Sequence, residues 1–166
     1  RTNINNIFAI GDVTSPPWLA HKASHEGVLV AEYISGNKMK KVSRYSIPGC
    51  TYSNPQVASV GFSEEKAIEK GYKIKVGKFP FIGNGKALAL GEEEGFIKTI
   101  YDSESGEILG AHLVGAEVTE LIHSYVLGKS LEGTDEDFIN SVFPHPTLSE
   151  MLHESALNAS SRAIHF

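Results

Sequence analysis

One short segment near the carboxyl end combines residue types suited to acid–base chemistry. Residues 143–150 read FPHPTLSE, with a proline on each side of His145. A carboxylate bound to one imidazole nitrogen fixes the tautomer and leaves the other nitrogen to take a proton, and Glu150 is placed for that role. Alternatively, Thr147 and Glu150 have the S/T-x-x-E spacing of a capping box, so Glu150 satisfies a backbone donor. The two interpretations are compatible, because a carboxylate has two oxygens.

A second candidate follows the apolar run 7–10, which reads IFAI and ends at Gly11 and Asp12. A short, continuous apolar run is typical of a buried parallel strand. Open α/β sheets bind ligands beyond the carboxyl ends of such strands. Asp12 is therefore a candidate to accept hydrogen bonds from the hydroxyls of a cofactor. The alternative is that Gly11 and Asp12 only turn the chain.

Other polar groups give weaker indications. His21 and His25 have the spacing of metal ligands on a helix, but no third ligand accompanies them. Residues 83–86 read GNGK, which lacks the spacing of a phosphate loop and predicts a turn. Cys50 is the only cysteine, so the chain has neither an internal disulfide nor a CxxC pair. A reducing, cytoplasmic location is the simplest expectation.

Composition excludes two classes of partner. The 166 residues carry a formal net charge of -5, whereas nucleic-acid binding requires a basic surface. No apolar stretch approaches the roughly 20 residues that span a bilayer. With 41% hydrophobic and 21% charged residues, the chain has the balance of an ordinary globular protein. We therefore expect neither a nucleic acid nor a membrane as partner.

The elements that position these candidates divide the chain in two. We predict the strand 7–10 and a helix over 19–34 in a first domain, 1–44, which ends in the polar, basic stretch 38–44. In a second domain, 45–166, β-rich runs alternate with helical stretches at 63–71, 118–129, 134–140 and 148–160. The predicted strands are 47–53, 57–62, 74–81, 95–101 and 108–114. Because the last two strands read as a hairpin and the helices are segregated, we predict an α+β fold, an antiparallel sheet with flanking helices.

Together the motifs resemble one family, the FAD-dependent pyridine nucleotide–disulfide oxidoreductases. Residues 7–12 (IFAIGD) with 18–23 (WLAHKA) are similar to its second flavin-contacting motif. Residues 54–61 (NPQVASVG) resemble the opening of its interface domain, and 145–150 (HPTLSE) its carboxyl-terminal histidine–glutamate signature. The resemblance covers essentially the whole chain. It implies that 1–44 is a strand–helix remnant of an FAD-binding domain and that 45–166 is the interface, or dimerisation, domain.

Within the family, the segments 79–81 (FPF), 95–98 (GFIK) and 109–115 (LGAHLVG) resemble the branch that oxidises dihydrolipoamide and reduces NAD⁺. Glutathione reductases share the histidine–proline–threonine and glutamate elements, so a glutathione-type disulfide reductase is an alternative. A further alternative, of another class, is a dimerisation module without catalytic function. In that case His145 and Glu150 would have only structural roles.

The resemblance assigns roles to particular residues. Asp12 would bond the ribityl or pyrophosphate region of FAD. Backbone groups at the start of the following helix would lie near the flavin ring; they belong to Trp18, Leu19, Ala20 and His21. His145 would be the acid–base group for the lipoyl dithiol, with Glu150 orienting its ring. The family pattern also suggests a cis peptide bond before Pro146.

The resemblance also implies partners and missing parts. Residues 45–166 would form a homodimer in which each active site needs two chains, and the substrate would be the lipoyl domain of a 2-oxoacid dehydrogenase complex. The sequence has no GxGxxG fingerprint and no paired cysteines, and it begins at Arg1. We therefore expect a fragment whose NAD site, and the rest of whose FAD site, lie in a preceding portion. Alone, it should have no dehydrogenase activity and no strong flavin affinity.

Overall fold

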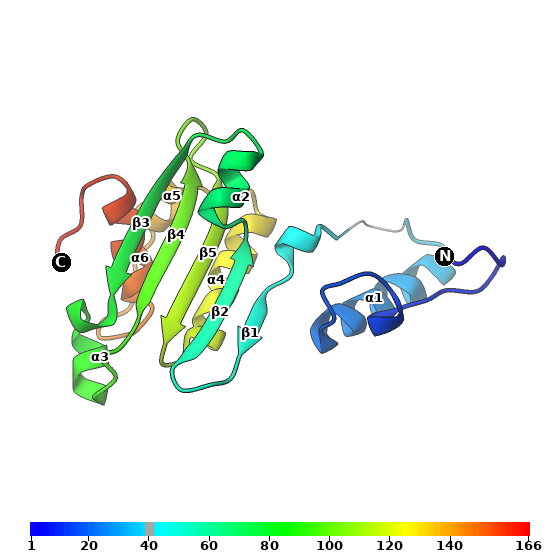
Figure 1. Cartoon of the computed structure of the whole chain (residues 1–166), viewed down its shortest axis with the longest axis horizontal. Coiled ribbons are helices and arrows are strands. Elements are labelled where there is room, and N and C mark those ends of the chain that lie inside the picture. The colour runs from blue at the N-terminus through cyan, green and yellow to red at the C-terminus, as the bar shows by residue number, and fades with distance from the viewer. Residues whose placement is uncertain (39–41) are drawn as a thin grey trace. The chain divides into compact units, whose positions relative to one another are not determined.

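Five antiparallel strands form the framework that carries the candidate acid–base residues (Figure 1). In the computed structural model their order across the sheet is β1-β2-β5-β4-β3. Their bounds are β1 (Gly49–Thr51), β2 (Gln56–Gly61), β3 (Ile74–Pro80), β4 (Phe96–Asp102) and β5 (Ile108–Gly115). The predicted hairpin is confirmed, because β4 and β5 pair antiparallel around a short turn. The α+β prediction is confirmed with it.

The structure describes residues 1–38 and 42–166. These separate into two units, Arg1–Ile47 and Pro48–Phe166. The sequence-based boundary, between 44 and 45, falls within the short 3-10 helix η2 (Arg44–Ser46). Part of the basic stretch 38–44, which was expected to mark that boundary, lies outside the described residues.

Helices cover both faces of the sheet unequally. On one face, α4 (Val118–Ser130) packs on β2 and β5, and α6 (Glu150–Ala159) packs on β3 and β4, with α5 (Asp135–Asn140) beside α6. On the other face, α2 (Glu64–Glu69) buries Ala67 against Ile100 and Leu109. Neighbouring residues of a strand point to opposite faces, so Tyr101 belongs to the larger core beneath α4 and α6.

The seat of α6 on the sheet depends on a glycine and a polar cluster. A Cβ at Gly77 of β3 would overlap the carbonyl oxygen of Ser155 in α6, so only glycine permits this approach. The Ser155 hydroxyl donates to the Gly77 carbonyl at 3.2 Å and lies 3.0 Å from the hydroxyl of Thr99. Thr99 in turn bonds the buried hydroxyl of Tyr125 at 2.7 Å. Buried polar groups that satisfy each other in this way hold the helix in one register.

One helix was not expected. We predicted only a turn at 83–86, whereas η3 (Phe81–Gly83) leads directly into α3 (Gly85–Leu90). Asn84 caps α3, because its side-chain oxygen accepts a hydrogen bond from the Ala87 N–H at 2.9 Å. Gly91 ends the helix with a φ of 72°, the left-handed conformation that suits glycine. The turn prediction was wrong because it considered the phosphate-loop pattern and overlooked a cap followed by helix-forming residues.

The first unit consists mainly of η1 (Gly11–Val13) and α1 (Ala20–Ile34). The predicted helix is confirmed, but the predicted buried strand 7–10 is wrong. These residues belong to no strand of the described chain, and Ile7 and Ile10 are 51% and 42% exposed. A strand is defined by hydrogen bonds to a neighbour, and the described part of this unit offers 7–10 no neighbouring strand.

Candidate functional site

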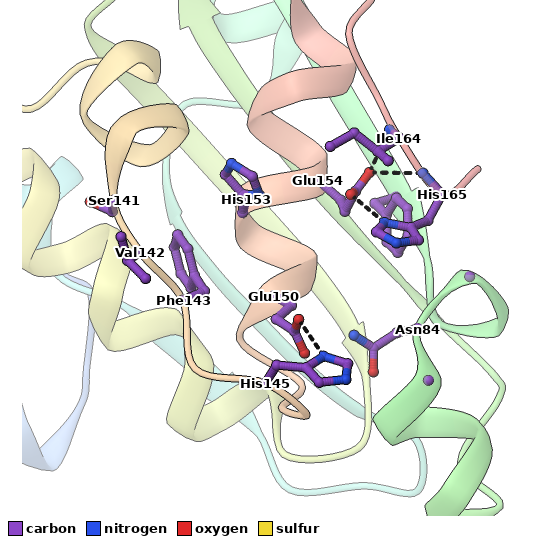
Figure 2. A pocket seen from close by; sticks show the side chains of 13 residues that line it. Asn84, Ser141, Val142, Phe143, His145, Glu150, His153, Glu154, Ile164 and His165 are labelled. Atoms are coloured by element: carbon purple, nitrogen blue, oxygen red, sulfur yellow. Dashed lines mark hydrogen bonds and ion pairs between the residues drawn. The ribbon is translucent and has the colours of Figure 1, made fainter.

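His145 and Glu150 are in direct contact. The Nδ1 atom of His145 lies 2.9 Å from Oε1 of Glu150, the first residue of α6 (Figure 2). The second carboxylate oxygen accepts a hydrogen bond from the Thr147 N–H at 2.8 Å. The two functions considered for Glu150, bonding the imidazole and satisfying a backbone donor, therefore occur together, one on each oxygen.

Only half of the anticipated capping box forms. The Thr147 hydroxyl donates to the Pro144 carbonyl at 2.7 Å instead of serving the first turn of α6, and Ser149 occupies the N-cap position. Because that donation uses the only hydroxyl proton of Thr147, Ser149 must donate in their mutual contact at 2.8 Å. The peptide bond before Pro146 is cis, as the resemblance suggested.

Electrostatics determine which nitrogen of His145 carries a proton. Burial alone would raise the pKa of Glu150. The hydrogen bonds from Thr147 and His145, with the nearby imidazoles, outweigh burial and hold that pKa below its ordinary value. Glu150 is thus an ionised acceptor, so His145 Nδ1 is the donor, and in the neutral form of the imidazole Nε2 carries the lone pair. The side chain of His145 is largely exposed, so this lone pair can meet a substrate.

A pocket of about 370 Å³ extends from this pair and contains a second histidine–glutamate pair. His165 Nδ1 lies 2.7 Å from Oε1 of Glu154, one turn along α6. The other oxygen of Glu154 accepts from the backbone N–H groups of Ile164 and His165, at 3.1 and 3.4 Å (Figure 2). Sequence reasoning found no constellation for His165. The only available signal was two acidic positions, 150 and 154, one turn apart on a helix.

The residues expected to contact a flavin lie in the first unit. Asp12 is exposed on η1, and Trp18 is exposed with its indole N–H donating to the Thr14 carbonyl at 3.2 Å. Leu19 occupies the N-cap position of α1, with Ala20 and His21 following it in the first turn. Leu19 has no polar side-chain atom and makes no side-chain cap at the start of the 15-residue helix, whose positive end favours an electron-rich group. The Asp12 carboxylate, as an acceptor, and the backbone N–H groups at a helix start, as donors, are groups of the kind that a flavin nucleotide can bond.

Sequence reasoning missed two residues that hold this loop. The buried Lys22 Nζ donates to the Thr14 hydroxyl at 2.8 Å and pairs with Glu26 at 2.9 Å. Glu26 accepts from the Gly11 N–H at 2.8 Å. The hydrogen bonds from Lys22 and Gly11 hold the pKa of Glu26 below its ordinary value, so it remains an ionised acceptor. The available signal was a lysine four residues before a glutamate on one face of the predicted helix.

The weaker candidates from the sequence, the pair of His21 and His25 and the single Cys50, belong to no functional site among the described residues. Among residues 1–38 and 42–166, no group of three or more His, Cys, Asp or Glu side chains could hold a metal ion, and His21 and His25 are both exposed. Burial raises the pKa of the Cys50 thiol, so the reactive thiolate is disfavoured. Within the same described residues, no helix is long and apolar enough to cross a membrane.

Comparison with known proteins identifies the family of the chain. Residues 47–156 match the family model for the "Pyridine nucleotide-disulphide oxidoreductase, dimerisation domain". The dihydrolipoyl dehydrogenase of Zymomonas mobilis is 56% identical over 167 residues, which cover 100% of this chain and 36% of that relative. For the Rhizobium etli enzyme of the same name the identity is 53%, with 99% and 34% covered. The chain thus spans about a third of the length of the curated relatives it matches.

Solved structures share the fold. LpdA from Mycobacterium tuberculosis aligns with a TM-score of 0.88 over 94% of this chain and 34% of its own, at 22% identity. The HOCl-induced flavoprotein disulfide reductase RclA from Escherichia coli aligns with a TM-score of 0.83 at 25% identity, over 91% of this chain and 35% of its own. Because the identity to LpdA is low, that likeness supports the fold alone.

Proposed function

The chain belongs to the pyridine nucleotide–disulphide oxidoreductase family through that family's dimerisation domain, and on this premise we propose that it is the carboxyl-terminal third of a dihydrolipoyl dehydrogenase. The complete enzyme would oxidise protein-bound dihydrolipoamide and reduce NAD⁺. The relatives at 56% and 53% identity support this substrate class. The single observation that carries the catalytic proposal is the bond from His145 Nδ1 to the ionised Glu150, which leaves Nε2 as a base.

In this proposal His145 takes a proton from the substrate dithiol. A thiol with a pKa of about 8.5 is mostly protonated at neutral pH, and the thiolate is the reactive form. His145 Nε2 accepts the thiol proton, and the resulting imidazolium is stabilised by the Glu150 carboxylate on the opposite nitrogen. The loop keeps the ring in place, because both carboxylate oxygens of Glu150 are engaged at once.

The first unit would contribute to flavin binding. Asp12 would accept hydrogen bonds from hydroxyls of the ribityl or pyrophosphate region, and the backbone of Trp18 to His21 would lie beside the ring system. When bound, FAD supplies the transfer of electrons between a dithiol and NAD⁺. The positive end of α1 would favour the electron density of a reduced ring. The NAD site and the remaining FAD contacts would lie outside residues 1–166, so the chain alone would be inactive.

The second unit would form the homodimer that completes each active site. Apolar side chains at the pocket rim support this proposal, because Val142 and Ile164 line the pocket and are 98% and 70% exposed. Exposed apolar groups beside a concave site are typical of interaction surfaces. The lipoyl domain of a 2-oxoacid dehydrogenase complex is the substrate carrier that the proposal implies, and the reducing, cytoplasmic location remains an expectation.

The test is a substrate comparison on the full-length protein that carries residues 1–166. We expect rapid NADH formation from dihydrolipoamide and NAD⁺, and none of comparable rate from glutathione disulfide with NADPH. Turnover only with glutathione disulfide would move the enzyme to another branch of the family. Absence of both activities in a flavin-loaded dimer would favour a dimerisation module without catalytic function.

A further inference from the structure

Thr147 is the residue through which the loop around His145 is held, and all of its backbone and side-chain polar groups are engaged. Its N–H donates to Glu150 at 2.8 Å, and its hydroxyl donates to the Pro144 carbonyl at 2.7 Å. Its carbonyl oxygen accepts from the side-chain amide of Asn84 at 3.1 Å. The first two bonds lie within the loop and the start of α6. The third reaches a residue far away in the sequence.

Asn84 is oriented for this contact by its own environment. It is 5% exposed, lies between η3 and α3, and lines the same pocket as His145 (Figure 2). Its side-chain oxygen must accept from the Ala87 N–H at the start of α3. The amide nitrogen is therefore the atom that faces Thr147, and only an amide supplies an acceptor and a donor at these two places.

Hydrogen bonds connect Asn84 to the base in three steps. Asn84 bonds the Thr147 carbonyl, the Thr147 N–H bonds Glu150, and Glu150 bonds His145 at 2.9 Å. The loop is also anchored by Leu148, which is buried in the core. The apolar contacts of Leu148 keep the loop against the core but do not fix its orientation, because apolar contacts have no preferred direction. A hydrogen bond is directional. Asn84 is thus the described side chain outside the loop and α6 that orients Thr147 through a hydrogen bond.

We propose that Asn84 is a positioning residue for His145, acting through Thr147 and Glu150. The inference rests on the proposed function, since it assumes that His145 moves a proton. Loss of the amide donor would leave the Thr147 peptide free to tilt, and the imidazole would spend less time in the reactive orientation. Misalignment of a catalytic group lowers kcat, whereas KM, which reflects contacts with the remainder of the substrate, is retained.

The test uses three variants of the full-length, flavin-loaded enzyme. Asn84→Asp retains an oxygen to cap α3 but has no N–H to donate to Thr147. Asn84→Ser also retains a capping oxygen, and its shorter side chain withdraws the hydroxyl from the place of the amide nitrogen that reaches the Thr147 carbonyl. Ser63→Ala is the matched control, because Ser63 caps the equally short α2 by accepting from the Lys66 N–H, on the opposite face of the sheet. We expect kcat to fall about tenfold in both Asn84 variants with KM within about twofold, and both constants to be nearly unchanged in Ser63→Ala.

A second readout follows the bond itself. Hydrogen exchange at the Thr147 amide should accelerate in both Asn84 variants and remain at the wild-type rate in Ser63→Ala. Wild-type kcat in Asn84→Ser, or a lower kcat with unchanged Thr147 exchange, would overturn the inference. His145→Gln in the same assay separates the two proposals. If it is impaired and Asn84→Ser is not, only the role of Asn84 fails; if it turns over normally, the proposed function fails.

Discussion

Two histidine–glutamate pairs line one pocket, and both glutamates belong to α6, but one histidine precedes the helix and the other follows it. In the pair of His145 and Glu150 the side chains are 80% and 28% exposed, whereas in that of His165 and Glu154 they are 66% and 6% exposed. Glu150 uses its second oxygen to hold the loop before α6, and Glu154 uses its second oxygen to hold the segment after it. The same chemical contact therefore holds the loop before α6 in one place and residues 164–165 after it in the other.

The two pairs also differ in how the backbone around each histidine is held. His145 lies between two prolines in a loop that Thr147 braces from three directions, so its ring has a defined place. His165 is next to the last residue and is held by a single carboxylate, which accepts three hydrogen bonds from two consecutive residues. A carboxylate that collects donors from one short segment fixes that segment.

The largest expected effect on stability comes from a change that disturbs both pairs together. Gly77→Ala would force α6 away from β3, because the added methyl group would overlap the Ser155 carbonyl oxygen. We expect a loss of about 1–3 kcal/mol in the free energy of unfolding, measured by urea denaturation. Gly85→Ala is the control, since a Cβ there meets open space. Equal unfolding free energies of the two variants would contradict the close approach of α6 to β3 at Gly77.

The next largest effect is a difference in kcat between variants of Glu150 and variants of Glu154. Glu150→Gln would remove the charge that stabilises the imidazolium of His145, so kcat of the full-length enzyme should fall on the order of 10–100-fold. Glu154→Gln should stay within about twofold of the wild type, since it holds only the chain end. Similar losses of kcat in both variants would contradict the different roles of the two pairs.

The reverse contrast should appear in the order of the chain end. Glu154→Ala removes the oxygen that accepts hydrogen bonds from the backbone N–H groups of Ile164 and His165. In the variant these N–H groups can bond water instead. We expect a destabilisation of about 1 kcal/mol and faster hydrogen exchange at these two amides. Glu150→Ala should leave their exchange unchanged. Unaltered exchange in Glu154→Ala would refute the anchoring role.

The smallest effect is a pH dependence carried by Glu150. Its pKa is lowered in the fold, so its contribution to stability is complete above the ordinary value of 4.5 and disappears as the pH falls through the folded pKa. The difference in unfolding free energy between wild type and Glu150→Gln should shrink below about pH 4.5, and should stay under about 1 kcal/mol because the pair is near the surface. A difference that grows with acidity would contradict this assignment.

Sequence reasoning succeeded where the interactions are local. The hairpin of β4 and β5 joins strands through a short turn. The helix predicted at 134–140 begins with a capping box between Thr134 and Asp137, which lie three positions apart, so neighbouring residues carry both signals. The contact of His145 with Glu150 also spans one short loop. These features depend on spacing, which the sequence displays directly.

The missed features depend on residues that the fold brings together. Asn84 and Thr147 are 63 positions apart, and Glu154 meets His165 only because the chain turns back after α6. Periodicity carries no information about such encounters. The strand expected at 7–10 failed for the same reason, since an apolar run forms a strand only beside a partner. The helix α3 was instead a local signal that we misread.

The most direct test of the account compares two substitutions in the full-length enzyme, His145→Gln and His165→Gln, with dihydrolipoamide and NAD⁺ as substrates. We predict that kcat falls by about 10²–10⁴-fold in the first variant, with dimer and flavin retained, and changes little in the second. Normal turnover of His145→Gln, or an equal loss in His165→Gln, would contradict the claim that the loop pair carries the acid–base chemistry.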